Sequence, residues 1–259
     1  MPITQFLILK IPTVLLGIIV IGCAVLFAIF GGLLVRRFVP HKRLQLHHDV
    51  ADPILGALAA TYAVLVAFVV VTVWQGFDKS NANVQFEANY LADVYQDSEA
   101  FSPEFHKRVG DLVREYRQAI IDKEWEKMQM GEMSPEVEEI MRKIWAEYTT
   151  YEPKTAMEKS FFDESVSKLN LLRELRRQRI MDSRTGLIPL LWFVLLAGGL
   201  TTISFTFFFG AENWKAQTLM SVLLATTIFL ILFAIMEMDF PFTGDIRISP
   251  EPFKTLLLD

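Results

Sequence analysis

Four long stretches of the chain contain no Asp, Glu, Lys or Arg. A helix of about 20 residues crosses a bilayer core of about 30 Å, and each of the four stretches is long enough to do so. Several ends carry Trp or Phe, the side chains that anchor helices at membrane interfaces. We therefore predict four transmembrane helices, within Ile11–Val35, Pro53–Phe77, Thr185–Ala211 and Ala216–Met236.

The charged residues are concentrated in one segment. Of 55 charged side chains, 39 lie between Asp78 and Arg184, although the whole chain is only 21% charged and has a mean hydropathy of +0.33. This distribution excludes a soluble globular enzyme and a disordered protein. Cys23 is the only cysteine, which excludes a secreted disulfide scaffold. The net charge of −5 argues against nucleic acid as a partner.

The segment between the second and third stretches is predicted to be helical throughout. Apolar residues recur in it at three- and four-residue spacing, as at Phe105 and Val109. Helix starts are indicated by Ser102–Pro103, by Ser134–Pro135 and by Pro153. We expect three or four amphipathic helices packed as a bundle. The second and third transmembrane helices are expected to continue into this bundle without a break.

The predicted fold class is an all-α integral membrane protein, with four transmembrane helices and a cytosolic helical bundle inserted between spans 2 and 3. Residues 1–77 hold the first two spans, 78–184 form the soluble helical domain, 185–236 hold the last two spans and 237–259 form a C-terminal tail. An even number of spans puts both termini on the face of the helical domain. Basic residues near the span ends number eight on that face and five on the other, which favours a cytoplasmic domain and termini. Four of those five lie in the short first loop, and this argues for the opposite orientation.

The sequence contains no pattern that identifies an enzyme or a metal site. It has no glycine-rich phosphate loop, no paired histidines at helical zinc spacing and no Cys-x-x-Cys. The first loop gathers potential ligands, but histidines near a membrane interface and carboxylates that cap the next helix explain them without a metal. We predict no catalytic residues, no metal and no cofactor, and we assign no metal to these five loop residues: His41, His47, His48, Asp49 and Asp52.

Polar residues follow one face of the second predicted span. Such a stripe usually faces protein or water rather than lipid. In one interpretation it lines a pore formed by several subunits, with an apolar constriction at Leu65 and Phe68. In the other, its hydroxyl and amide groups bond to neighbouring helices, while Gly56 and Ala60 permit close packing. From the residues alone we favour the packing interpretation. The stripe consists of Thr61, Leu65, Phe68, Thr72, Gln75 and Lys79.

Several segments resemble a bacterial membrane-protein family of unknown function that is called bestrophin-like. Together they run from the first loop almost to the end of the chain. They are HHDVADPILGALAATYAVLVAFVVVTVWQGF (47–77), VQFEANYLADVY (84–95), YRQAIIDKEW (116–125), RELRRQRI (173–180), IPLLWFVLLAGG (188–199) and DFPFTGDIRISPEPF (239–253).

The resemblance implies properties that the residues alone do not. Bestrophins are oligomeric anion channels, usually pentamers, with four spans per subunit, and their second span lines the pore. The segment after the last span resembles the bestrophin segment whose acidic run holds calcium. Here Ile246, Arg247 and Ile248 replace that run. A calcium site is therefore only an open alternative, with oxygen ligands at Glu237, Asp239 and Asp245.

We accordingly predict a homo-oligomeric ion channel of a bacterial inner membrane, with lipids and small inorganic ions as its other partners. The stripe on the second span is the predicted pore lining. Lys79 favours anions, whereas Asp78, Glu87 and Asp93 would concentrate cations, and anions are preferred. The alternative is a membrane-anchored helical scaffold or sensor without a pore. In that case the cluster Arg173–Arg184 binds a partner, or it simply holds anionic lipid head groups.

Overall fold

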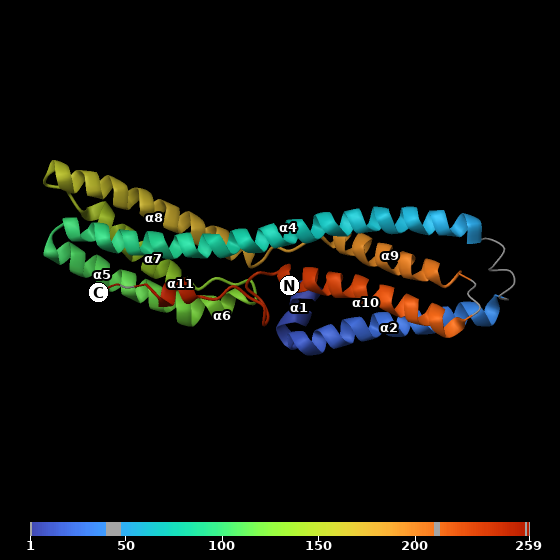
Figure 1. Cartoon of the computed structure of the whole chain (residues 1–259). Coiled ribbons are helices and arrows are strands. Elements are labelled where there is room, and N and C mark those ends of the chain that lie inside the picture. The colour runs from blue at the N-terminus through green and yellow to red at the C-terminus, as the bar shows by residue number, and fades with distance from the viewer. Residues whose placement is uncertain (1, 40–47, 210–212, 257, 259) are drawn as a thin grey trace. The chain divides into compact units, whose positions relative to one another are not determined.

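The computed structural model describes residues 2–39, 48–209, 213–256 and 258. These residues form helices, turns and irregular segments, and none of them is in a β-strand (Figure 1). The α-helices are α1 (Ile3–Lys10), α2 (Thr13–Phe38), α4 (His48–Asp97), α5 (Pro103–Ala119), α6 (Trp125–Met128), α7 (Pro135–Thr150), α8 (Ala156–Asp182), α9 (Pro189–Thr206), α10 (Trp214–Met238) and α11 (Glu251–Lys254). A 3-10 turn, η1 (Ser98–Ala100), follows α4, and a π-helical turn, η2 (Ile120–Glu124), joins α5 to α6.

The chain forms two compact units. The membrane unit comprises Lys10–Gln75 and Gly186–Asp239, and the helical unit comprises Met1–Leu9, Gly76–Thr185 and Phe240–Asp259. Both chain ends therefore belong to the helical unit, whereas the sequence analysis kept residues 1–9 and 240–259 apart from it. Helix α4 contributes residues to both units.

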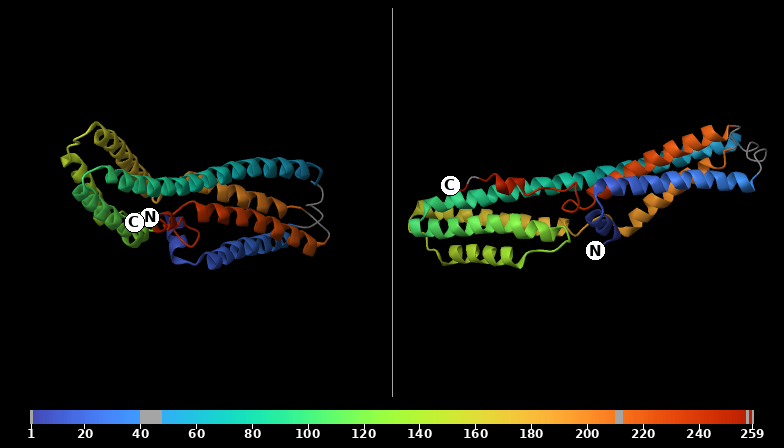
Figure 2. Two further views of the ribbon diagram at one scale, coloured as in Figure 1. Left: turned by 60° about the vertical axis from the view of Figure 1, so that its left-hand side comes forward. Right: turned by 90° about the horizontal axis from the view of Figure 1, so that it is seen from below.

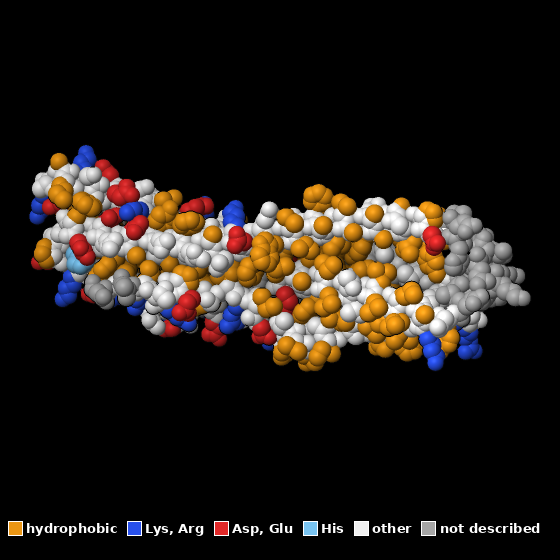
Figure 3. Space-filling model, viewed as in Figure 1, with side chains coloured by type: hydrophobic (Ala, Val, Ile, Leu, Met, Phe, Trp, Pro, Cys, Tyr) orange, Lys and Arg blue, Asp and Glu red, His pale blue; other side chains and the backbone are white. Residues whose placement is uncertain are grey.

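The membrane unit contains helices long and apolar enough to cross a bilayer. They are α2, α9, α10 and the apolar first half of α4. Their outward surfaces carry many large apolar side chains, such as Phe30, Phe193 and Leu219 (Figure 3). Apolar surface of this extent is favourable against lipid and costly against water. The four predicted spans are therefore confirmed as helices of the right length and composition for a membrane.

Close helix packing in the membrane unit depends on small residues. Helix α2 packs along α10, and the second view in Figure 2 shows the two side by side. Helix α4 meets α9 where the Tyr62 ring lies over Gly198, and a Cβ atom at Gly198 would be 2.6 Å from that ring. The Tyr62 hydroxyl donates a hydrogen bond to the Leu195 carbonyl at 2.9 Å. Glycine at position 198 thus allows the contact.

The helical unit has an aromatic core at one end. The rings of Phe101, Phe105, Tyr148, Tyr151 and Phe162 pack edge-on, tilted or stacked, with centroids 4.4 to 6.5 Å apart. These residues come from α5, α7, α8 and their connections, which explains why the apolar stripes of the sequence converge.

The two chain ends complete the helical unit. The Gln5 side chain donates hydrogen bonds to the Ser183 carbonyl and to the Thr243 hydroxyl, both at 3.2 Å. Phe242 and Phe253 are fully buried, and both rings lie against Trp125. Residues that the sequence analysis called a tail are therefore part of a hydrophobic core.

Helix boundaries agree with the predicted signals in some places and not in others. The second span continues without a break to Asp97, as predicted. The prediction that the third span also continues unbroken into the bundle was wrong, because α8 ends at Asp182 and α9 begins at Pro189. A proline disfavours helical geometry in the residue before it, and Ile188 is extended, with φ −62° and ψ 143°.

The predicted helix starts are confirmed for α5 and α7 but not for α8. Ser102 caps α5, with its hydroxyl accepting a hydrogen bond from the Phe105 N–H, and α7 begins after Ser134. Helix α8 begins after Thr155 rather than at Pro153, because the Thr155 hydroxyl accepts the Glu158 N–H at 3.0 Å.

Candidate functional site

The predicted pore stripe lies outside the buried face of α4. That buried face is formed by Tyr62, Val66, Val69 and Val73, which pack inside the membrane unit. Leu65 is half-buried against the same core, and Phe68 is 70% exposed. The other stripe residues are exposed as well. Thr61, Thr72 and Gln75 lie in the membrane unit, and Lys79 lies in the part of α4 that belongs to the helical unit.

The hydroxyl groups of the stripe bond to their own helix. Thr61 donates to the Ala57 carbonyl at 2.9 Å, and Thr72 donates to the Phe68 carbonyl at 2.8 Å. A Cβ atom built on Gly56 would meet no atom within 4 Å. Among the described residues these hydroxyl groups do not join α4 to a neighbouring helix, whereas the packing interpretation required that they do. Apart from the half-buried Leu65, the stripe is exposed in the part of the chain that the structure describes.

The three carboxylates considered for calcium are engaged in different ways. Both oxygens of Asp239 accept N–H groups, from the Leu187 backbone at 2.6 Å and from the Trp192 indole at 3.2 Å. Glu237 accepts a hydrogen bond from the Thr13 hydroxyl at 3.0 Å. Asp245 is exposed and belongs to the helical unit, whereas the other two belong to the membrane unit.

No group of three or more His, Cys, Asp or Glu side chains suited to a metal is formed among the residues that the structure describes. In the first loop, His41 and His47 lie outside the described residues. The side chains of His48 and Asp49 are also outside them, and Asp52 is exposed near the start of α4.

A buried charge cluster joins three parts of the helical unit. It consists of Glu87 on α4, Glu124 at the end of η2, and Arg176 and Arg179 on α8. Arg179 donates to both oxygens of Glu87 and, at 2.9 Å, to Glu124. Arg176 donates to both oxygens of Glu124, at 3.1 and 2.7 Å, and also to Glu138. The four side chains of the cluster are 5% exposed or less.

The electrostatics of the cluster follow from burial and mutual attraction. Burial raises the pKa of Glu87 above its ordinary value, although Arg179 opposes this effect. Burial also acts to raise the pKa of Glu124, but Arg179 and Arg176 together outweigh it and the pKa is lowered. The pKa of Arg179 is raised, because the two carboxylates outweigh the cost of its burial. The cluster therefore holds charged groups in the core by pairing them.

Sequence analysis missed this cluster. It treated the arginines from 173 to 184 as a cluster that binds a partner or anionic lipid head groups, whereas Arg176 and Arg179 point into the core. The available signal was their spacing, because the buried stripe of Leu169 and Leu172 continues through both arginines at three- and four-residue steps.

These features define an all-helical membrane protein with an attached helical unit. Residues 22–253 match the family model of the bestrophin-like domain, so the chain belongs to the bestrophin-like family. No significant match is found among curated protein sequences.

Solved structures share the fold at low sequence identity. One variant of a bacterial bestrophin homologue from Klebsiella pneumoniae has a TM-score of 0.66 and 12% identity, over 88% of this chain and 94% of that chain. Another variant has a TM-score of 0.65 and 11% identity, over 92% and 96%. A further structure, described as a membrane protein variant, has a TM-score of 0.67 and 10% identity, over 92% and 94%.

Proposed function

We propose that this protein is an ion channel formed by several copies of the chain, with the stripe on α4 lining the pore. The family supports a channel, since the bestrophins that the sequence resembles are oligomeric channels. The observation that carries the assignment is the exposed polar stripe. The Gln75 amide and the Lys79 ammonium group of this surface are costly against lipid and favourable against water or a second copy.

The side chains of the stripe suit different parts of a pore. Leu65 and Phe68 are apolar and one helical turn apart, so copies of them around an axis form a hydrophobic constriction. Thr72 and Gln75 offer hydroxyl and amide groups to water in a wider vestibule. Lys79 places a positive charge at the end of the stripe.

The ion pairs of the helical unit support a preference for anions. Glu87 and Asp93 were the two downstream carboxylates that favoured cations. Glu87 is fully buried against Arg179, and Asp93 lies 3.4 Å from the Lys168 ammonium group. The negative charge of Glu87 is therefore compensated within the subunit, whereas Asp93 shares Lys168 with Asp97 and Glu164. Asp78 and Lys79 remain exposed near the mouth.

The proposed assembly and location follow from resemblance and charge. The resemblance favours a pentamer, in a bacterial inner membrane, with both termini and the helical unit in the cytoplasm. The proposal includes no catalytic step and no resident cofactor, and calcium enters it only as an ion to be tested.

The test measures assembly and flux of the full-length protein. Subunit number is determined by native mass spectrometry in detergent, and chloride and sodium fluxes are measured in liposomes. Phe68→Ala is expected to increase flux several-fold, because it removes an aromatic ring from the constriction. Trp74→Ala is the matched control. Trp74 is 62% exposed on the same helix, about 120° around the axis from Phe68.

Two results would contradict the proposal. One is a monomer without flux in either variant, which would leave the scaffold or sensor in its place. The other is equal flux changes for the two variants, which would remove Phe68 from the constriction.

A further inference from the structure

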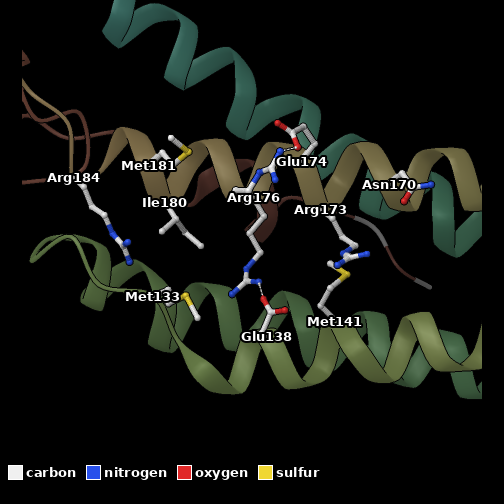
Figure 4. Close-up of a pocket in the computed structure, with 11 residues that line it drawn as sticks. Met133, Glu138, Met141, Asn170, Arg173, Glu174, Arg176, Ile180, Met181 and Arg184 are labelled. Carbon is white, nitrogen blue, oxygen red and sulfur yellow. Dashed lines mark hydrogen bonds and ion pairs between the residues drawn. The ribbon is translucent and has the colours of Figure 1, made fainter.

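The helical unit contains an arginine-rich cavity that the proposed channel does not use. It has a volume of about 610 Å³ and lies between α8 on one side and α7 with the turn before it on the other. Figure 4 shows Arg173, Arg176 and Arg184 extending from the α8 side toward Met133 and Met141. We call this cavity the arginine groove.

The groove carries more positive than negative charge. Its lining includes four arginines, at 173, 176, 177 and 184, and two carboxylates, Glu138 and Glu174. Arg176 is paired with Glu124 and Glu138, and Arg177 is paired with Glu174. These pairs account for the two carboxylates of the lining.

Arg173 and Arg184 have uncharged partners instead. The Arg173 guanidinium lies over the Trp145 ring, 5.2 Å from its centroid. Arg184 Nε donates to the Gly131 carbonyl at 2.6 Å. Among the residues that the structure describes, neither arginine forms an ion pair with a carboxylate. Both guanidinium groups are therefore held in place while their charges stay uncompensated.

Apolar side chains separate the two charges. Arg173 lies on α8, and Arg184 lies two residues beyond the end of that helix, 11 positions later in the chain. Ile180, Met141 and Met181 contribute apolar surface to the groove, and methionine adapts to apolar groups of varied shape. The groove thus offers positive charge at both ends, with apolar side chains and the Arg176–Glu138 ion pair between them (Figure 4).

One end of the groove is tied by the chain to a membrane helix. Arg184 lies five residues before Pro189, the first residue of α9. Five residues of extended chain span at most about 18 Å. Chain connectivity alone therefore keeps Arg184 within reach of the head-group layer of any bilayer that α9 crosses.

We propose that the arginine groove binds a phosphate-bearing anion that has an apolar part. The phosphate accepts hydrogen bonds from Arg184 or Arg173, and the apolar part lies along the methionines. Guanidinium groups bind phosphate with paired N–H donors, and fixed guanidinium groups lose little entropy on binding. The ligand is either the head group of an anionic phospholipid or a soluble phosphate ester. This inference does not depend on the channel.

The test compares binding of three probes to the full-length protein in detergent. Dioctanoyl phosphatidylglycerol represents an anionic lipid, ATP represents a soluble phosphate ester, and dioctanoyl phosphatidylcholine is the zwitterionic control. The test variant is Arg173→Gln with Arg184→Gln. The matched control is Arg108→Gln with Arg142→Gln, which removes two exposed arginines that pair with Glu147 and Glu139 elsewhere in the unit.

We expect phosphatidylglycerol or ATP to bind the wild type, and the test variant to lose at least about tenfold in affinity for that probe. The control variant is expected to change affinity less than twofold. Loss for phosphatidylglycerol alone identifies a lipid head group, and loss for ATP alone identifies a soluble ligand. Equal losses in both variants would show general charge attraction and overturn the proposal, and so would the absence of binding by either anionic probe. Thermal unfolding of all variants establishes that they are folded.

Discussion

Arg179 and Glu87 form a fully buried pair between residues 92 positions apart in the chain, with N–O distances of 2.6 and 2.9 Å. The two parallel hydrogen bonds fix the orientation of both side chains. Arg179 also lies 5.0 Å from the centroid of the Trp125 ring, so it contacts the aromatic core as well as the carboxylates. The pair thereby holds α8 against α4 in the helical unit.

Replacing this arginine should destabilise the helical unit strongly. Arg179→Met leaves Glu87 without its partner and Glu124 with only Arg176, and breaking a buried pair typically costs about 3 to 5 kcal/mol. Chemical denaturation in detergent, followed by circular dichroism, measures the effect. Arg177→Met is the control, since its pair with Glu174 is exposed, and we expect it to change stability by less than about 1 kcal/mol. Equal effects of the two substitutions would contradict this account.

Stability should also depend on pH through Glu124. Its folded-state pKa lies below the ordinary value of 4.5, so its contribution is complete above that value and is lost as the pH falls through the folded pKa. The difference in melting temperature between wild type and Glu124→Gln should therefore stay constant from pH 7 down to about pH 5 and shrink as the pH falls further below 4.5. Glu126→Gln, at an exposed neighbouring position, is the control. A difference that stays constant below pH 4.5 as well would disprove the role of Glu124.

Asp239 should connect the end of α10 to the start of α9, because its carboxylate accepts hydrogen bonds from both sides of that start. It accepts hydrogen bonds from Leu187 and Trp192, so Asp239→Ala leaves two N–H donors without their partner and should cost roughly 2 to 5 kcal/mol. Because both oxygens are already engaged, adding calcium or EDTA should leave the melting temperature of the wild type unchanged. A calcium-dependent rise that Asp239→Ala abolishes would instead establish the alternative cation site.

The contact between Tyr62 and Gly198 should respond to paired substitutions. Gly198→Ala places a Cβ atom 2.6 Å from the Tyr62 ring and should lower the melting temperature by several degrees. The same substitution in a Tyr62→Ala background should cost much less, because the ring is gone. A double-mutant cycle measures this coupling, and additive effects would show that α4 and α9 do not meet here.

Much of the fold can be predicted from local patterns. Charge-free stretches locate the four membrane helices, and Ser102 locates the start of α5 through its capping hydroxyl. The helix break before Pro189 could also have been predicted, since proline disfavours a helical conformation in the residue before it. The apolar length of the third stretch concealed this signal.

Other features depend on contacts that no local pattern records. Arginine is a residue that usually lies on a solvated surface. Arg176 and Arg179 can be buried only because the distant Glu87 and Glu124 pair with them. Gln5 is bonded to residues more than 170 positions away, so the place of the N-terminus in the helical unit could not be inferred. The stripe on α4 differs again, because the described residues leave Phe68 70% exposed and its role rests on the proposed assembly.

The helical unit is built from segments that are far apart in the sequence, and this has a consequence for biosynthesis. Its core closes around Trp125 only when Phe242 and Phe253 are present, and both follow α10 in the sequence. During translation, part of the apolar surface of the helical unit therefore stays exposed until the ribosome has synthesised the last membrane helix and the residues that follow it. The helical unit can therefore be completed only after all four spans have been synthesised. A chain that stalls before residue 240 exposes an incomplete core to proteases and chaperones.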